Sequence, residues 1–89
     1  MATRVTRFKK LLLTRFKGAE VEIDHYPESD RTGATVVWKG FVGKDEVERQ
    51  RMVRKAIQKG LGPQQASRIS IVLTFTPDEM AAMREGSKV

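Results

Sequence analysis

Residues 68–75 constrain the fold more than any other segment, because large apolar side chains alternate with smaller ones along it. Isoleucine, leucine and phenylalanine take positions 69, 71, 73 and 75, and serine, valine and threonine lie between them. A period of two residues predicts a strand. Ile71 and Leu73 are central in this run, and we expect Leu73 to be buried.

Two earlier segments also alternate and predict two further strands. Residues 20–25 place Glu20, Glu22 and Asp24 on one face and Val21, Ile23 and His25 on the other. Residues 34–39 form the next strand, and turn-forming residues fill positions 26–33 between the two. Strands that follow each other across a short loop predict an antiparallel hairpin.

Helical patterns surround the three strands. Residues 3–17 carry apolar side chains three or four positions apart and stop at Gly18, a residue typical of the position just after a helix. The segment 44–59 has acids in its first turns and bases in its last, as the helix dipole favours. A helical turn at 64–67 and a helix at 77–85, which a Thr-Pro-Asp-Glu capping box begins, complete the series.

The order of elements is therefore helix, strand, strand, helix, helical turn, strand, helix. We expect a single small domain over residues 1–89, of the α+β class, with a three-stranded mixed sheet and helices packed on one face. The basic helix at about 3–17 begins this domain, and the short helix at about 77–85 ends it.

Composition excludes several kinds of site. The chain has no cysteine, which rules out disulfides, thiol nucleophiles and cysteine metal sites. His25 is the single histidine, which rules out a pair of histidine ligands. We find no catalytic pattern, and we expect no enzyme, no cofactor and no metal. The longest apolar runs fall far short of the roughly 20 residues of a membrane-spanning helix, and without a secretory apolar segment we expect a cytoplasmic protein.

The charge is unevenly placed along the chain. There are 17 Lys and Arg residues against 11 Asp and Glu residues, a net charge of +6. Residues 1–17 hold six of the bases and no acid, so the remainder is balanced at 11 against 11. A basic end of this kind indicates a polyanionic partner, either nucleic acid or an anionic membrane surface. It is also typical of an organelle transit peptide, although here the helix has a clear stop and runs directly into a strand.

Several motifs together resemble the BolA family, a group with a KH-like fold of the second type. Phe41-Val42-Gly43, followed by Val-Glu-Arg-Gln-Arg-Met-Val at 47–53, resembles the family signature. The strand that starts Ile69-Ser70-Ile71 and the Thr-Pro-Asp-Glu after it resemble the family's closing strand and helix start. The match covers about residues 3–83. It implies a BolA-like fold and a part in transcription regulation or the stress response.

The chain departs from this family at one position of interest. Gln50 stands where the resemblance implies a histidine between two arginines, and that histidine is implied to ligate an iron–sulfur cluster shared with a monothiol glutaredoxin. A glutamine amide is a poor ligand for such a cluster. The loop at 26–34 offers no cysteine or histidine. His25 is only a weak ligand candidate, and it is more simply a residue at the end of a strand.

We expect contact with the phosphate backbone of nucleic acid to fall on the helices, since the acids of the first strand would repel phosphate. Such contacts need cations on one face and read no particular base. The candidate residues are Arg4, Arg7, Lys9, Lys10, Arg49, Arg51, Arg54 and Lys55. The alternative is a solvated helix face, with Asp45 and Glu48 pairing some of these cations. The glycines of Gly40–Gly43 match a KH-type loop in the wrong position.

Three hypotheses on function remain open. The first is a non-enzymatic BolA-like regulatory protein that binds nucleic acid through a basic helical face. The second is an adapter that docks on a monothiol glutaredoxin in iron–sulfur homeostasis, with cluster ligation weakened by Gln50. The third is a protein-interaction module without either partner. The sequence leaves open DNA against RNA, the oligomeric state, and whether the basic first helix packs on the domain.

Overall fold

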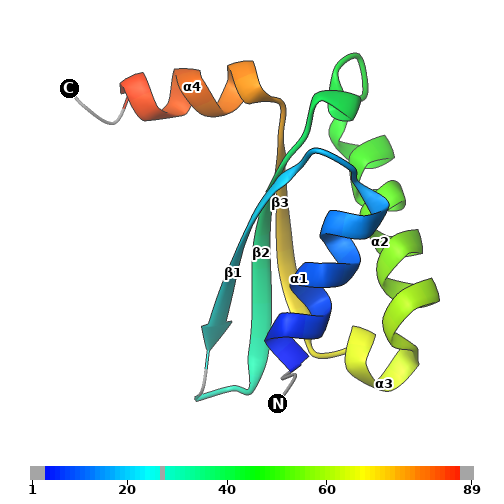
Figure 1. Cartoon of the computed structure of the whole chain (residues 1–89). Coiled ribbons are helices and arrows are strands. Elements are labelled where there is room, and N and C mark those ends of the chain that lie inside the picture. Colours follow the sequence, from blue (N-terminus) through cyan, green and yellow to red (C-terminus); the bar gives the residue numbers. More distant parts are fainter. Residues whose placement is uncertain (1–3, 27, 87–89) are drawn as a thin grey trace.

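The fold was analysed in a computed structural model, which describes residues 4–26 and 28–86. It has the expected order of elements, and Figure 1 shows α1 and α2 together on one face of the sheet. The elements are α1 (Arg4–Arg15), β1 (Glu20–Tyr26), β2 (Arg31–Val37), the 3₁₀ turn η1 (Lys39–Phe41), α2 (Glu46–Leu61), α3 (Pro63–Ala66), β3 (Ile69–Phe75) and α4 (Pro77–Gly86). The expected start of the first helix at residue 3 lies outside the described residues.

The three strands form one mixed sheet in the order β1-β2-β3. β1 and β2 form the expected antiparallel hairpin, and β3 runs parallel to β2 after the crossover through α2 and α3. β2 begins at Arg31, three residues earlier than we expected. The reason is a tighter turn, in which Asp30 takes a left-handed backbone with φ 52°, a conformation that aspartate tolerates better than most residues. Gly33, which we had placed in the loop, therefore lies inside the strand.

The core lies between the helices and the sheet. Phe8, Leu12 and Phe16 of α1 are buried there, so the basic first helix packs on the rest of the fold. Val36 of β2 enters the core from the sheet and Val53 of α2 from the second helix, and both are nearly inaccessible to solvent. Burial of such residues is the main source of stability in a domain of this size.

An aromatic cluster closes one end of this core. The rings of Phe16, Trp38 and Phe41 lie 5.0–5.6 Å apart between centroids, within the range of favourable edge-to-face pairs. The Trp38 indole N–H donates a hydrogen bond to the Lys17 carbonyl oxygen at 2.9 Å. Gly40 is needed here, because a Cβ at this position would overlap the Trp38 ring.

The expectation that Leu73 is buried is wrong. Leu73 is 44% exposed and Ile71 57% exposed, whereas Val72 and Thr74 are each 5% exposed. The cause is a β-bulge, in which Gly33 alone on β2 lies opposite two residues of β3, 70 and 71. A bulge adds one residue to one strand, and a shift of one residue exchanges the two faces of all that follows.

The last helix begins as the capping box predicts. The Thr76 backbone N–H donates to Glu79 Oε1 at 2.8 Å, and the Glu79 N–H donates to Thr76 Oγ1 at 3.2 Å. Figure 1 shows that α4 then runs away from the sheet, on the side opposite α1 and α2. In the described part of the chain no helix is long and apolar enough to cross a membrane.

Candidate nucleic-acid interface

The helix layer, formed by α1 and α2, carries most of the basic side chains. The two helices touch where Leu11 of α1 lies against Gly60 of α2. A Cβ at Gly60 would overlap the Leu11 side chain, so the glycine allows the close approach. The sequence of α1 contains no acid, and the acids of α2 fall in its first turn. The remaining length of both helices therefore presents mainly cations.

A groove of about 810 Å³ runs between α1 and the end of α2. We call it the α1–α2 groove, and it is lined by Thr6, Arg7, Lys10, Leu11, Thr14, Arg15, Gly60 and Leu61. Within the described part of the chain, none of these residues is acidic and three are basic. Arg15 was not among our candidates, although its spacing of eight residues from Arg7 places both on one helical stripe.

The other predicted bases do not gather in this groove. Lys9 lines a neighbouring groove of about 460 Å³ beside Ile23 of β1. Arg54 lies on the opposite flank of α2, beside β3, while Arg51 and Lys55 are exposed on α2. The side chain of the eighth candidate, Arg4, lies outside what the structure describes. The basic side chains are thus spread over several sides of the helix layer, and the α1–α2 groove holds the densest group of them.

Arg49 does not belong to this surface. It is 8% exposed, and its guanidinium forms a two-pronged ion pair with Glu79, at 2.7 and 3.2 Å. It also donates to the backbone carbonyl oxygens of Lys44 at 2.9 Å and Phe41 at 3.2 Å. The hydrogen bond with Glu79 raises the pKa of Arg49 above its ordinary value. Its Nη1 also donates to the Thr74 carbonyl oxygen at 3.5 Å. All the N–H donors of the side chain are thus directed at partners inside the fold, and we remove Arg49 from the candidate interface.

Glu79 shows the other side of this pairing. Its hydrogen bond with Arg49, together with the hydrogen bond from the Thr76 backbone N–H, lowers the pKa of Glu79 to about 2. The carboxylate therefore stays charged well below the pH at which a glutamate is ordinarily protonated, and the ion pair between α2 and α4 is present at neutral pH.

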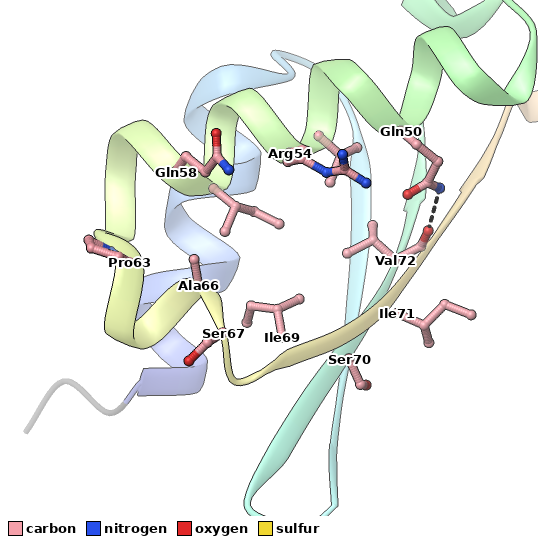
Figure 2. A pocket seen from close by; sticks show the side chains of 12 residues that line it. Gln50, Arg54, Gln58, Pro63, Ala66, Ser67, Ile69, Ser70, Ile71 and Val72 are labelled. Atoms are coloured by element: carbon pink, nitrogen blue, oxygen red, sulfur yellow. Dashed lines mark hydrogen bonds between the residues drawn. The ribbon is translucent and has the colours of Figure 1, made fainter.

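A second groove, of about 690 Å³, lies between α2, α3 and β3 (Figure 2). We call it the α2–β3 groove. Its floor is apolar, and its polar lining includes Gln50, Arg54 and Gln58 of α2. Gln50 Nε2 donates to the Val72 carbonyl oxygen at 2.8 Å and to Glu46 Oε1 at 2.8 Å. The amide at this signature position thus satisfies a carbonyl oxygen of β3, which is an edge strand of the described sheet.

The loop side of the sheet offers little for a metal. His25 is exposed, and its Nδ1 lies 3.3 Å from Thr32 Oγ1 on the neighbouring strand. Over residues 4–26 and 28–86, no three His, Cys, Asp or Glu side chains lie together in a way that could hold a metal ion.

The other face of the sheet has the opposite charge. Glu20, Glu22 and Asp24 of β1 are all exposed there, on the face that α1 and α2 leave uncovered (Figure 1). The protein is therefore polarised, with cations on the helix layer and carboxylates on the sheet. A polyanion approaching this molecule would be directed to the helices.

No protein-family model matches the chain, and no curated protein matches it. Solved structures do match. The BolA domain of SufE1 from Arabidopsis thaliana is similar with a TM-score of 0.70 at 19% identity, over 89% of this chain and 98% of that one. BolA1 from Arabidopsis thaliana gives 0.68 at 23% identity, over 89% and 98%. A bol-like protein from Babesia bovis gives 0.63 at 20% identity, over 94% and 96%. The chain therefore has the BolA-like fold that the sequence resemblance implied.

Proposed function

We propose that this chain is a non-enzymatic regulatory protein that binds the phosphate backbone of nucleic acid through its helix layer. The observation that carries the proposal is the α1–α2 groove, which brings Arg7, Lys10 and Arg15 to one surface, with no acid among the lining residues that the structure describes. Cations on flexible stems can follow a chain of phosphates without a fixed register.

The same surface lacks what base reading requires. In the described structure Phe8, Phe16 and Phe41 are buried in the core, and the exposed Tyr26 lies on β1, outside the α1–α2 groove. The groove therefore offers no stacking platform to single-stranded bases. We expect binding with little sequence preference, in which release of counterions supplies most of the affinity.

The experiment is a titration of a labelled duplex oligonucleotide at about 50 mM salt, where phosphate contacts are strong. The test variant combines Arg7→Gln, Lys10→Gln and Arg15→Gln. The matched control, Arg31→Gln with Lys39→Gln and Arg84→Gln, removes the same charge from exposed positions outside the groove. We expect the test variant to bind at least about tenfold more weakly than the control. An equal loss of affinity in both variants would show that only the net charge of the protein matters. Absence of wild-type binding would refute the proposal.

A second candidate function, docking on a monothiol glutaredoxin, is favoured by the α2–β3 groove. The groove combines an apolar floor with polar side chains beside an edge strand, features typical of a protein-docking surface. Gln50 already donates to Val72, and glutamine is a poor cluster ligand, so we expect docking without cluster ligation by this residue.

This candidate is tested by mixing the two proteins anaerobically with iron and sulfide, and by following complex size and visible absorption. Arg54→Glu in the groove should weaken the complex, while Arg51→Glu on the exposed helix face should not. We expect no histidine-type cluster absorption in the wild type and partial ligation in Gln50→His. A wild-type cluster ligated by His25 would overturn this interpretation. If neither nucleic acid nor glutaredoxin binds, the chain is a protein-interaction module with other partners.

A further inference from the structure

The face of the sheet that faces away from α1 and α2 carries two different rows of side chains. We call it the open sheet face. The carboxylates Glu20, Glu22 and Asp24 form a row along β1, and all three are exposed. Ile71 and Leu73 form an aliphatic row along β3, 57% and 44% exposed. Figure 2 shows Ile71 pointing away from α2. Figure 1 shows that α1 and α2 lie on the other face, and that α4 projects outward on this side from the end of β3.

The central strand places a small side chain, that of Thr35, between the two rows. In the strand register, Glu22 lies beside Thr35 and Thr35 beside Leu73. Gly33, two residues away along β2, faces the same side, and the edge of the Tyr26 ring lies against it. The rows stand two strand spacings apart, roughly 10 Å, which is close to the diameter of an α-helix with its side chains. A helix that lies along the strands over Thr35 therefore reaches both rows with its side chains.

The acidic row has no cation directly opposite it, and Arg31 of β2 lies diagonally from Asp24 on the same face. The cross-strand partners of Glu20, Glu22 and Asp24 are Val37, Thr35 and Gly33, none of which is a cation. Like charges two residues apart on one strand repel, and sheets ordinarily gain stability from opposite charges across strands. Carboxylates left without such partners, next to exposed aliphatic side chains, are typical of a surface that a partner completes.

We propose that the open sheet face binds a cationic amphipathic helix of a partner protein, with its basic side chains on the β1 carboxylates and its aliphatic side chains on Ile71 and Leu73. Because the face repels phosphate, it stays available whether or not the helix layer is occupied. The inference therefore does not depend on the binding of nucleic acid, while Ile71 also lines the α2–β3 groove.

A second copy of this chain fits this face poorly. A two-fold axis across the strands would set the acidic rows against each other. A two-fold axis along the strands would set each acidic row on the aliphatic row of the other copy. Both arrangements bury carboxylates without cations, which is costly.

The test uses a fluorescein-labelled synthetic peptide that carries Lys on one helical stripe and Leu on the adjacent stripe. A peptide of the same composition in scrambled order is its control. The protein variant combines Glu20→Gln, Glu22→Gln and Asp24→Asn. The matched variant combines Glu28→Gln, Asp78→Asn and Glu85→Gln, which removes the same charge from exposed positions elsewhere. A third variant, Leu73→Thr, changes the aliphatic row alone.

We expect the sheet variant to bind the amphipathic peptide at least about tenfold more weakly than the matched variant, and Leu73→Thr to weaken it as well. The Trp38 fluorescence of all three should stay native, because the changed side chains are exposed. Equal binding of the scrambled peptide, or equal weakening by both charge variants, would overturn the proposal. So would sedimentation showing self-association that Leu73→Thr abolishes.

Discussion

Arg49 and Glu79 join α2 to α4 through two parallel contacts, Nη1 to Oε1 at 2.7 Å and Nη2 to Oε2 at 3.2 Å. The same guanidinium lies 5.7 Å from the centre of the Phe41 ring and donates to the Phe41 carbonyl oxygen. One side chain thus connects α2, α4 and the segment before α2. Arg51, two positions later in the same motif, is exposed. The two arginines of the Arg-Gln-Arg motif therefore have different tasks, the first internal and the second on the surface.

Replacement of Arg49 should therefore cost stability. Arg49→Met keeps an apolar stem but leaves the Lys44 and Phe41 carbonyls and the Glu79 carboxylate without their donor. We expect the free energy of unfolding to fall by about 3 kcal/mol. Arg51→Met, the matched control on the exposed face, should change it by less than about 0.5 kcal/mol. Urea titrations that follow Trp38 fluorescence measure both, and equal effects would contradict the internal role of Arg49.

The lowered pKa of Glu79 predicts a defined acid sensitivity. Its pKa falls from an ordinary 4.5 to about 2 in the folded protein. The folded state therefore holds fewer protons than the unfolded state between these values, and stability decreases as the pH falls from 4.5 towards 2. The contribution is complete above pH 4.5.

Glu79→Gln isolates this effect, because glutamine keeps the capping box with Thr76 but cannot form the ion pair. We expect the variant to be less stable at neutral pH and to lose less stability than the wild type on acidification. The measurement is the urea midpoint at several pH values. If the urea midpoints of the two proteins fall in parallel as the pH is lowered, Glu79 is not the group that causes the acid sensitivity.

The sequence predicted the elements well because each had a local cause. The capping box of Thr76 and Glu79 and the apolar stripe of α1 need only neighbouring residues to be recognised. The face of β3 could not be predicted in this way, since the bulge opposite Gly33 is a property of two strands together. Likewise, nothing local distinguishes Arg49 from Arg51. The partner that buries Arg49 lies 30 residues along the chain, and only the tertiary arrangement brings it close.

The bulge leads to a clear contrast between adjacent residues of β3. Val72→Ala removes a side chain that is 5% exposed and should lower the free energy of unfolding by about 2 kcal/mol. Leu73→Ala removes a larger side chain that is 44% exposed, yet it should cost less than about 1 kcal/mol. Thermal or urea unfolding of the two variants measures both losses and shows whether Val72 or Leu73 faces the core. A larger loss of stability in Leu73→Ala than in Val72→Ala would show that Leu73 faces the core, as strict alternation without a bulge predicts.

The salt dependence of nucleic-acid binding gives the sharpest test of the α1–α2 groove. Each phosphate neutralised contributes about −0.9 to the slope of log K against log salt on duplex DNA. If four phosphates are contacted, the wild-type slope is about −3.6. The combined Arg7→Gln, Lys10→Gln and Arg15→Gln variant should then have a slope shallower by up to about 2.7, because three of the contacts are lost.

Two further variants test whether the contacts lie in the α1–α2 groove or elsewhere on the protein. They are Arg49→Met and the sheet variant Glu20→Gln with Glu22→Gln. Arg49 is internal and the two glutamates lie on the face that repels phosphate, so both changes should leave the slope close to the wild-type value. Fluorescence anisotropy at a series of salt concentrations gives all the slopes. If the slope for Arg49→Met is shallower than that of the wild type by about 0.9, the value for one phosphate, while the variant keeps its fold, the Arg49 guanidinium reaches nucleic acid. The interface then extends to the α2–α4 junction rather than lying between α1 and α2.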